Sequence, residues 1–302
     1  MTGLRQVIDA AARELTAAGV NSPRADALEL AAHAAGVDRG RLLLLDGPDD
    51  ASFLARYREL VAARARRVPL QHLTGSAAFG PVTLSVGPGV FIPRPETEAL
   101  LDWAVRHALP DLGPRPVIAD LCTGSGALAL ALHHHRPDAR IIAVDISDAA
   151  LEYARRNTAG TGIEVLRADV TAPELLAGLA GQVDLIVANP PYIPAPSVPA
   201  ESGLEPEVAR HDPPDALFGG PDGMAVITAI VDRAGVLLRP GGRCAIEHDD
   251  TTSAETVTAF TGTGRFVDVV ARRDLAGRPR FVTATRLGRG HQDSGHQEGL
   301  TR

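Results

Sequence analysis

Four consecutive residues, Asn189, Pro190, Pro191 and Tyr192, carry groups that can hold a planar amine or amide. They follow residues 183–188, an apolar run with the length and composition of a buried strand. Proline has no N–H and a fixed φ, so the two prolines end the strand and stiffen the loop after it. The Asn189 side chain and the Pro190 carbonyl can hydrogen-bond a –C(O)NH2 or aryl –NH2 group, and Tyr192 can cover its face. An ordinary turn is the alternative, because Asn and Pro are common turn residues.

A glycine-containing turn upstream points to a nucleotide-like ligand. Residues 117–121 form an apolar strand that contains Asp120, and the turn into the next helix consists of Cys122, Thr123, Gly124, Ser125 and Gly126. Glycine at such a turn lets the backbone approach a ligand closely. Asp145 ends the following strand about twenty residues later, where a carboxylate can accept hydrogen bonds from ribose hydroxyls.

These residues favour S-adenosylmethionine over NAD as the ligand. The glycine pattern is G-x-G, without the third glycine of the dinucleotide pattern, and Asp120 repels a pyrophosphate but suits an ammonium group. Asp169 and Val170 follow a third strand, residues 163–166, and we expect them at the cofactor, with Asp169 receiving the adenine amino group. The alternative for Asp169 is to cap a helix over residues 172–179.

The segment before the nucleotide-type strand is the third candidate element. Two prolines bracket Arg94 just before the helix that contains Leu100, Leu101 and Trp103. One interpretation is a stiff strap over the ligand, which brings Phe91, Pro93 and Arg94 to the cofactor. The other is a plain helix start, with Pro95 near the first turn and acidic residues beside its positive end.

The amino-acid composition excludes some classes of protein but does not identify a reaction. The chain has 302 residues, 45% hydrophobic and 22% charged, with a net charge of −7. These values are typical of a soluble globular protein and do not favour direct nucleic-acid binding. Cys122 and Cys244 make no disulfide framework or zinc site, and we read the run of histidines at 133–135 as surface, so no metal is expected. We expect no signal peptide or membrane span, and therefore a cytoplasmic enzyme.

Taken in order, Asp120, the G-x-G turn, Asp145, Asp169 and Asn189-Pro190-Pro191-Tyr192 resemble class I S-adenosylmethionine-dependent methyltransferases. Residues 69–75, 92–98 and 217–223 are similar to signatures of the HemK/PrmC family, the peptide chain release factor glutamine N5-methyltransferases. The resemblance covers roughly residues 1–287. Two departures stand out. Glu247 is followed by His248 where the family usually carries E-I-G-x-x-Q, and Cys122 stands where glycine is commoner.

The resemblance implies the fold and its parts. We expect an α/β, Rossmann-like, doubly wound seven-stranded sheet whose last strand is antiparallel, spanning residues 95–287. Residues 1–67 would form a helical substrate-recognition domain, 68–94 a β-hairpin connector and 288–302 a disordered tail. Arginines 64, 66 and 67 close the helical part, and we read them as compensating the helix dipole on a solvated face rather than binding RNA or an acidic partner.

The resemblance also implies the reaction, an EC 2.1.1 methyl transfer. S-adenosylmethionine would methylate N5 of the glutamine in the Gly-Gly-Gln motif of class 1 release factors and leave S-adenosylhomocysteine. Asn189 and the Pro190 carbonyl would aim the nitrogen at the methyl group, and no strong general base is expected. The alternatives are a ribosomal protein L3 glutamine methyltransferase, a nucleic-acid adenine N6-methyltransferase, and a donor-binding protein without activity.

Overall fold

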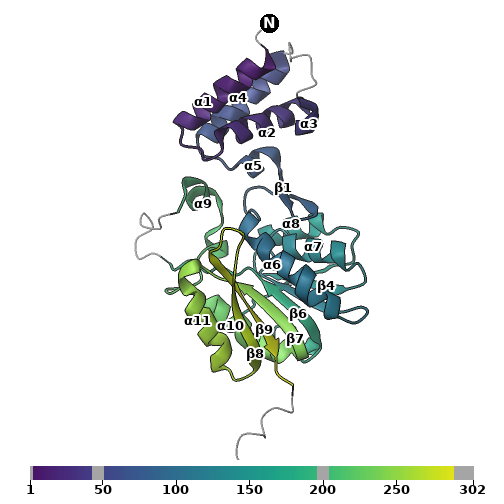
Figure 1. Cartoon of the computed structure of the whole chain (residues 1–302). Coiled ribbons are helices and arrows are strands. Elements are labelled where there is room, and N and C mark those ends of the chain that lie inside the picture. The colour runs from purple at the N-terminus through teal and green to yellow at the C-terminus, as the bar shows by residue number, and fades with distance from the viewer. Residues whose placement is uncertain (1–2, 43–50, 196–203, 289–302) are drawn as a thin grey trace, which may run out of the picture. The chain divides into compact units, whose positions relative to one another are not determined.

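The computed structural model describes residues 3–42, 51–195 and 204–288 (Figure 1). The described chain packs into two compact units. The helical unit comprises residues up to 77, residues 86–89 and residues 204–212, and the sheet unit comprises residues 78–85, the chain from 90 to 195, and the chain after 212. The predicted disorder of residues 289–302 and the predicted helix cap at residues 49–50 lie outside the described residues.

The helical unit is built from short helices. Leu4, Ile8, Ala11 and Leu15 recur at helical spacing and are all buried, which is why residues 4–17 fold as a helix with one apolar face. Gly36 ends the second helix in the left-handed conformation, at φ +66°. The helices are α1 (Leu4–Ala17), α2 (Pro23–Ala35), α3 (Arg39–Leu42), α4 (Ala51–Ala65), α5 (Leu70–Thr74) and α9 (Pro206–His211).

An ionic cluster inside the helical unit corrects the prediction for the arginines at the end of α4. Arg64 is buried, and its guanidinium reaches Asp26 Oδ2 at 2.7 Å and Glu207 Oε1 at 2.8 Å. Arg67 Nε donates to Glu207 Oε1 at 2.6 Å. Two of the three arginines therefore pair with carboxylates of this chain instead of lying on a solvated face, and Arg66 takes no part in the cluster.

Strands β1 (Ser76–Phe79) and β2 (Val82–Ser85) form a two-stranded sheet, which confirms the predicted hairpin. Short helical pieces follow before the large sheet begins. They are η1 (Pro95–Thr97), α6 (Glu98–Trp103), the π-helical η2 (Ala104–Ala108) and η3 (Leu109–Asp111).

The large sheet has seven strands in the order β5-β4-β3-β6-β7-β9-β8. The strands from β5 to β7 pair in parallel, and β9 runs antiparallel to both β7 and β8. This arrangement confirms the predicted fold class, including the antiparallel last strand and the closing hairpin. The strands are β3 (Val117–Leu121), β4 (Arg140–Asp145), β5 (Glu164–Arg167), β6 (Val183–Ala188), β7 (Leu238–Glu247), β8 (Phe266–Arg273) and β9 (Pro279–Arg286).

Helices cover both faces of this sheet. Alternate strand residues such as Ala119, Ile142 and Ile186 share one apolar cluster with Ile230 of α10 and Phe260 of α11. On the opposite face, Trp103 of α6 packs its ring edge-on against Phe281 of β9. Figure 1 shows α10 and α11 together beside the sheet. The remaining helical elements are α7 (Ala127–His135), α8 (Asp148–Asn157), η4 (Ala177–Leu179), η6 (Pro214–Ala216), α10 (Ala225–Leu237), η7 (Asp250–Thr252) and α11 (Ser253–Gly262).

The helix over residues 172–179 that Asp169 would cap in the alternative interpretation does not form. Residues 172–179 form turns that end in the 3-10 helix η4, because Leu176 adopts the left-handed conformation at φ +47° and breaks helical continuity. The described part of the long loop over residues 193–222 contains α9 and η6. Among the residues that the structure describes, no helix has both the length and the apolar character needed to span a membrane.

Candidate active site

The register of the parallel strands brings the predicted site residues to one edge of the sheet. Leu121 of β3 pairs with Val144 of β4 and with Ala188 of β6, and Ala188 pairs with Ile246 of β7. The next residue on each strand therefore lies at the same carboxyl edge, where open α/β sheets bind ligands. Those residues are Cys122, Asp145, Asn189 and Glu247.

The turn at residues 122–126 is held open by backbone conformation and by Asp145. Cys122, Gly124 and Gly126 all have positive φ, and a Cβ added at Gly124 would meet no atom within 4 Å. Asp145 Oδ2 accepts the Gly124 N–H at 2.8 Å, and its Oδ1 accepts the Ser147 N–H at 2.9 Å. Burial raises the pKa of Asp145. A carboxylate has further lone pairs beyond these two bonds, so Asp145 retains acceptor capacity for ligand hydroxyls.

Asp120 lies beneath this turn and is fully buried. Its Oδ2 accepts hydrogen bonds from Thr123 Oγ1 at 2.5 Å and from the Ala129 N–H at 3.0 Å. Its Oδ1 is buried without a hydrogen-bond partner in the described part of the chain. Burial raises the pKa of Asp120 to about 7. The orphaned acceptor fits a cationic group, and the paired oxygen braces the turn.

Ser125 connects the turn to the hairpin of β1 and β2. The Ser125 carbonyl accepts from Asn157 Nδ2 at 2.8 Å, and the same amide group donates to the Ser85 carbonyl at 3.0 Å. Asn157 Oδ1 in return accepts the Ser85 N–H at 2.8 Å. The half-buried side chain of Asn157 therefore links β2 to the ligand turn.

Asp169 and Val170 follow β5 as predicted, with different environments. Asp169 is exposed, and its Oδ1 accepts from the N–H and the hydroxyl of Thr171 at 2.8 and 2.7 Å. This local turn replaces the helix cap that the sequence left open as an alternative. Val170 is buried in the sheet core, so the side available to a ligand is its backbone.

Phe91, Pro93 and Arg94 lie in the half-buried segment just before η1. The guanidinium carbon of Arg94 lies 4.9 Å from the centre of the Phe91 ring, a cation–π contact. Their predicted role at the cofactor stays a prediction.

Asn189, at the end of β6, is oriented by a side chain from η1. Its Nδ2 donates to Thr97 Oγ1 at 3.1 Å, and Thr97 is buried. Three residues later, the Tyr192 hydroxyl donates to Glu247 Oε1 at 3.1 Å. Burial, reinforced by the Glu247 charge, raises the pKa of Tyr192, so its hydroxyl keeps the proton that it donates.

Glu247 is fully buried at the end of β7, and burial raises its pKa to about 7. Its Oε2 has no hydrogen-bond partner within the described residues, and the Thr97 side chain partly offsets the rise in the pKa of this carboxyl. Sequence reasoning missed both residues as parts of the site. The available signals were the place of Thr97 in the motif at residues 92–98 and the position of Glu247 at a strand end next to that of Asn189.

The motif at residues 217–223 packs directly on the segment at residues 189–193. The Ile193 N–H donates to the Leu217 carbonyl at 2.8 Å, and the Gly219 N–H donates to the Ile193 carbonyl at 2.9 Å. A Cβ on Gly219 would overlap the Pro191 carbonyl oxygen, and one on Gly223 would overlap that of Tyr192. Only glycine permits this approach, so the motif braces the candidate catalytic loop.

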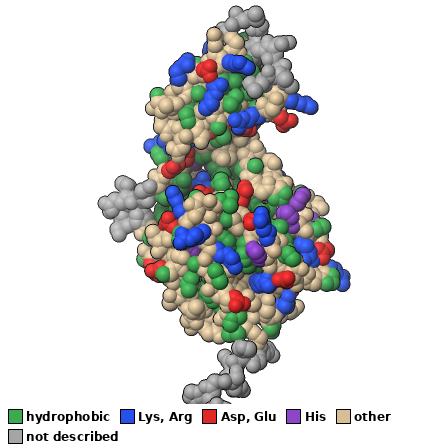
Figure 2. All heavy atoms as spheres, viewed as in Figure 1, with side chains coloured by type: hydrophobic (Ala, Val, Ile, Leu, Met, Phe, Trp, Pro, Cys, Tyr) green, Lys and Arg blue, Asp and Glu red, His purple; other side chains and the backbone are tan. Residues whose placement is uncertain are grey.

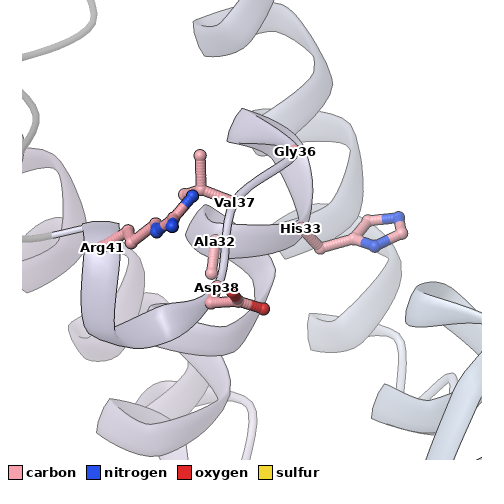
Figure 3. A pocket seen from close by; sticks show the side chains of 6 residues that line it. All are labelled: Ala32, His33, Gly36, Val37, Asp38 and Arg41. Carbon is pink, nitrogen blue, oxygen red and sulfur yellow. The ribbon is translucent and has the colours of Figure 1, made fainter.

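The helical unit contains a pocket of about 350 Å³ between α2 and α3, lined by residues that include His33, Asp38 and Arg41. Figure 3 shows the His33 ring pointing away from Arg41, so the two side chains do not converge on a shared ligand. None of the predicted site residues lines this pocket. In the described ranges no group of three His, Cys, Asp or Glu side chains is arranged to hold a metal ion, and the histidines at 133–135 form no such site.

Comparisons with known proteins cover nearly the whole chain. The family model described as "PrmC N-terminal domain" matches residues 6–75, and the one described as "Methyltransferase small domain" matches residues 87–198. "Release factor glutamine methyltransferase" of Mycolicibacterium smegmatis is 66% identical over 96% of this chain and 100% of that protein. The proteins of the same name from Mycobacterium tuberculosis H37Rv and Streptomyces coelicolor are 64% and 46% identical, over 94% and 91% of this chain and 92% and 95% of their own lengths. The chain therefore belongs to the release factor glutamine methyltransferase family.

Proposed function

We propose that this enzyme transfers the methyl group of S-adenosylmethionine to the side-chain N5 of the Gly-Gly-Gln glutamine in class 1 peptide chain release factors. The full-length similarity to release factor glutamine methyltransferases supports the reaction and its substrate. One observation in the site supports the binding of a carboxamide. Asn189 ends its strand with Nδ2 bonded to Thr97, which leaves Oδ1 to accept an N–H from a carboxamide.

The residues at the sheet edge fit the methyl donor. In this proposal Asp145 accepts the ribose hydroxyls, the backbone at residues 122–126 lies along the donor, and the orphaned Oδ1 of Asp120 faces its cationic end. Asp169 and Val170 hold the adenine, and Phe91, Pro93 and Arg94 cover the donor as a strap. When bound, the donor supplies an electrophilic methyl group on a sulfonium, so the proposed reaction calls for no metal.

Asn189 and Pro190 position the nucleophile in this mechanism. An amide nitrogen is a weak nucleophile, because its lone pair is delocalised into the carbonyl. Hydrogen bonds from its –NH2 to Asn189 Oδ1 and to the Pro190 carbonyl aim the nitrogen and stabilise the positive charge that develops on it. Pro191 stiffens the loop and Tyr192 covers the amide plane. As the nitrogen takes the methyl group, the methyl–sulfur bond breaks and S-adenosylhomocysteine forms. The cationic N-protonated methylamide is strongly acidic, so it then loses its proton without a strong base.

We further propose that residues 1–67 recognise the release factor, that residues 68–94 connect them to a catalytic domain over residues 95–287, and that the enzyme acts in the cytoplasm. The net charge of −7 supports a protein substrate over a nucleic acid. On the face shown in Figure 2, basic and acidic side chains are interspersed on both units, which supports the same choice.

The test is transfer of labelled methyl from S-adenosylmethionine to purified release factor, with its Gly-Gly-Gln glutamine intact or replaced. The proposal predicts label on the intact protein alone. Ribosomal protein L3 and duplex DNA are assayed in parallel. Label on either of these, with none on the release factor, would overturn the substrate and leave the methyltransferase chemistry in place.

A further inference from the structure

We propose that Thr97 and Glu247 are positioning residues that lock the side-chain amide of Asn189 in one orientation and so make the site selective for a hydrogen-bond donor. The inference rests on the proposed function, because it explains how the same site tells a carboxamide from a carboxylate. It concerns residues that do not touch the substrate in the proposed mechanism.

The hydroxyl of Thr97 has a single proton, and its surroundings decide where that proton goes. Thr97 is only 4% exposed, so water is not available as a general partner. Glu247 Oε2 is a buried acceptor without a hydrogen-bond partner in the described chain, and the Thr97 side chain, which bonds Asn189, lowers the pKa of the same carboxyl. A hydroxyl rotates to suit its neighbours, so the proton turns to the carboxyl.

With its proton directed to Glu247, Thr97 can only accept from Asn189. Thr97 Oγ1 lies 3.1 Å from Asn189 Nδ2, and the –NH2 end of the amide is the end that can donate to it. The reversed amide would place Asn189 Oδ1 against the Thr97 oxygen, with no proton between them. The order Glu247, Thr97, Asn189 therefore fixes which end of the amide faces outward.

The fixed orientation has a consequence for specificity. Asn189 presents Oδ1, an acceptor, to the substrate. A glutamine –NH2 donates a hydrogen bond to Asn189 Oδ1. A glutamate carboxylate would place a second acceptor there, and neither Oδ1 nor the carboxylate oxygen would have a donor. Sites built around a required hydrogen bond discriminate strongly against analogues that lack the donor.

The same carboxyl also holds the other end of the loop. Glu247 Oε1 accepts from the Tyr192 hydroxyl at 3.1 Å, so one buried side chain restrains Asn189 through Thr97 and Tyr192 directly. Both contacts join residues that are far apart in the sequence, 97 with 189 and 192 with 247.

The variants are Thr97→Val, which keeps the shape and removes the hydroxyl, and Thr97→Ser, which restores it. Thr256→Val is the matched control, because Thr256 is a buried threonine in α11 whose hydroxyl bonds the Thr252 carbonyl. We expect Thr97→Val to lower kcat on release factor roughly 100-fold, the loss typical of a misplaced reacting group, with donor affinity unchanged. Thr97→Ser should recover most of the rate, and Thr256→Val should keep it. Wild-type kcat in Thr97→Val, or no rescue by serine, contradicts the inference.

A second measurement needs no substrate. Asparagine occurs in this chain only at 21, 157 and 189, so selective ¹⁵N labelling resolves the Asn189 side-chain –NH2 by nuclear magnetic resonance. Its hydrogen exchange should be slow in the wild type and in Thr97→Ser, and about fivefold faster in Thr97→Val, because a net hydrogen bond is worth about 1 kcal/mol. Equal exchange in all three proteins would refute the inference even if the release factor were not the substrate.

Discussion

Cys122 occupies a backbone position that suits glycine better than any other residue. Its φ is +62°, in the left-handed region, where a Cβ costs about 1–2 kcal/mol. We predict that Cys122→Gly raises the free energy of unfolding by about 1 kcal/mol, since part of the gain is offset by the entropy of glycine in the unfolded chain. Urea denaturation measures this change in the free energy of unfolding, and Cys122→Ala, which keeps the Cβ, is the control. Equal stability of the two variants would contradict strain as the cause.

Glu247 makes stability depend on pH. Burial raises its pKa from 4.5 to about 7, so the folded protein keeps a proton that the unfolded chain has lost. The stabilisation is complete below pH 4.5 and disappears as the pH rises through 7, by up to about 3 kcal/mol. When ionised, the carboxylate accepts on both oxygens, so it can accept from Tyr192 on Oε1 and from Thr97 on Oε2.

We therefore predict that Glu247→Gln flattens the pH profile of the free energy of unfolding between pH 4.5 and 7 relative to the wild type. Comparing the two proteins at each pH removes the parallel contribution of Asp120. The exposed Glu255→Gln in α11 serves as the control and should leave the profile unchanged. Parallel profiles for wild type and Glu247→Gln would show that the buried carboxyl does not titrate in this range.

The sequence predicts the site residues that directly follow strands. It does not predict the contacts that residues from other parts of the chain make with them. Asn189, Asp145 and the turn at residues 122–126 could be predicted, because parallel strands end at a common edge. Thr97 and Glu247 could not, since each meets its partner across more than fifty residues of chain. The Thr97 hydroxyl and the Glu247 carboxylate can be seen in the sequence, but their hydrogen-bond partners can be identified only from the packing of the folded chain.

At the scale of elements, the contact between residues 217–223 and the Asn189 loop leaves the least room for a side chain. Gly219 lies so close to the Pro191 carbonyl that a Cβ would overlap it, and its neighbours there are backbone atoms that cannot rotate away. We predict that Gly219→Ala costs about 2 kcal/mol of stability and lowers methyl transfer at least about tenfold, because the loop must shift.

Thermal unfolding and single-turnover methyl transfer measure the two effects of Gly219→Ala. The matched control is Gly113→Ala, because Gly113 is exposed and an added Cβ meets no atom within 4 Å. Gly113→Ala should match the wild type in both assays. Normal transfer by a folded Gly219→Ala would show that the brace is not needed to place Asn189.

Prediction of the elements succeeded where periodicity and long strands carried the signal. The seven-stranded sheet and its antiparallel last strand were predicted from the family resemblance, because strand periodicity does not determine neighbours. The helix over residues 172–179 does not form, because Leu176 adopts the left-handed backbone conformation. The surrounding structure, and not local helix propensity, determines that conformation.

For the whole molecule, the two-unit organisation assigns part of the long loop after Tyr192 to the helical unit. Residues 204–212 pack there, while residues 90–195 and the described chain after residue 212 belong to the sheet unit. Glu207 anchors that segment, and its partners Arg64 and Arg67 are largely buried. Burial opposes ionisation of Glu207, but hydrogen bonds from Arg67 and Arg64 prevail and lower its pKa to about 2.

We predict that Glu207→Ala destabilises the protein by about 3 kcal/mol, because it leaves the buried Arg64 with one carboxylate fewer. Limited proteolysis should also cut residues 204–212 faster in this variant. Glu205→Ala is the control, since Glu205 makes an exposed hydrogen bond to Asn21 and should cost less than about 1 kcal/mol. Equal losses in the two variants would argue against a buried ionic anchor.

The central claim is that Asn189 directs the methyl group to one glutamine nitrogen. Fragment-ion mass spectrometry of release factor incubated with the enzyme and S-adenosylmethionine locates that group directly. We predict a single methyl on the Gly-Gly-Gln glutamine side chain with wild-type enzyme, and its near-complete loss with Asn189→Ala, which should still bind the donor. A methyl on any other residue, or undiminished methylation by Asn189→Ala, would contradict the account.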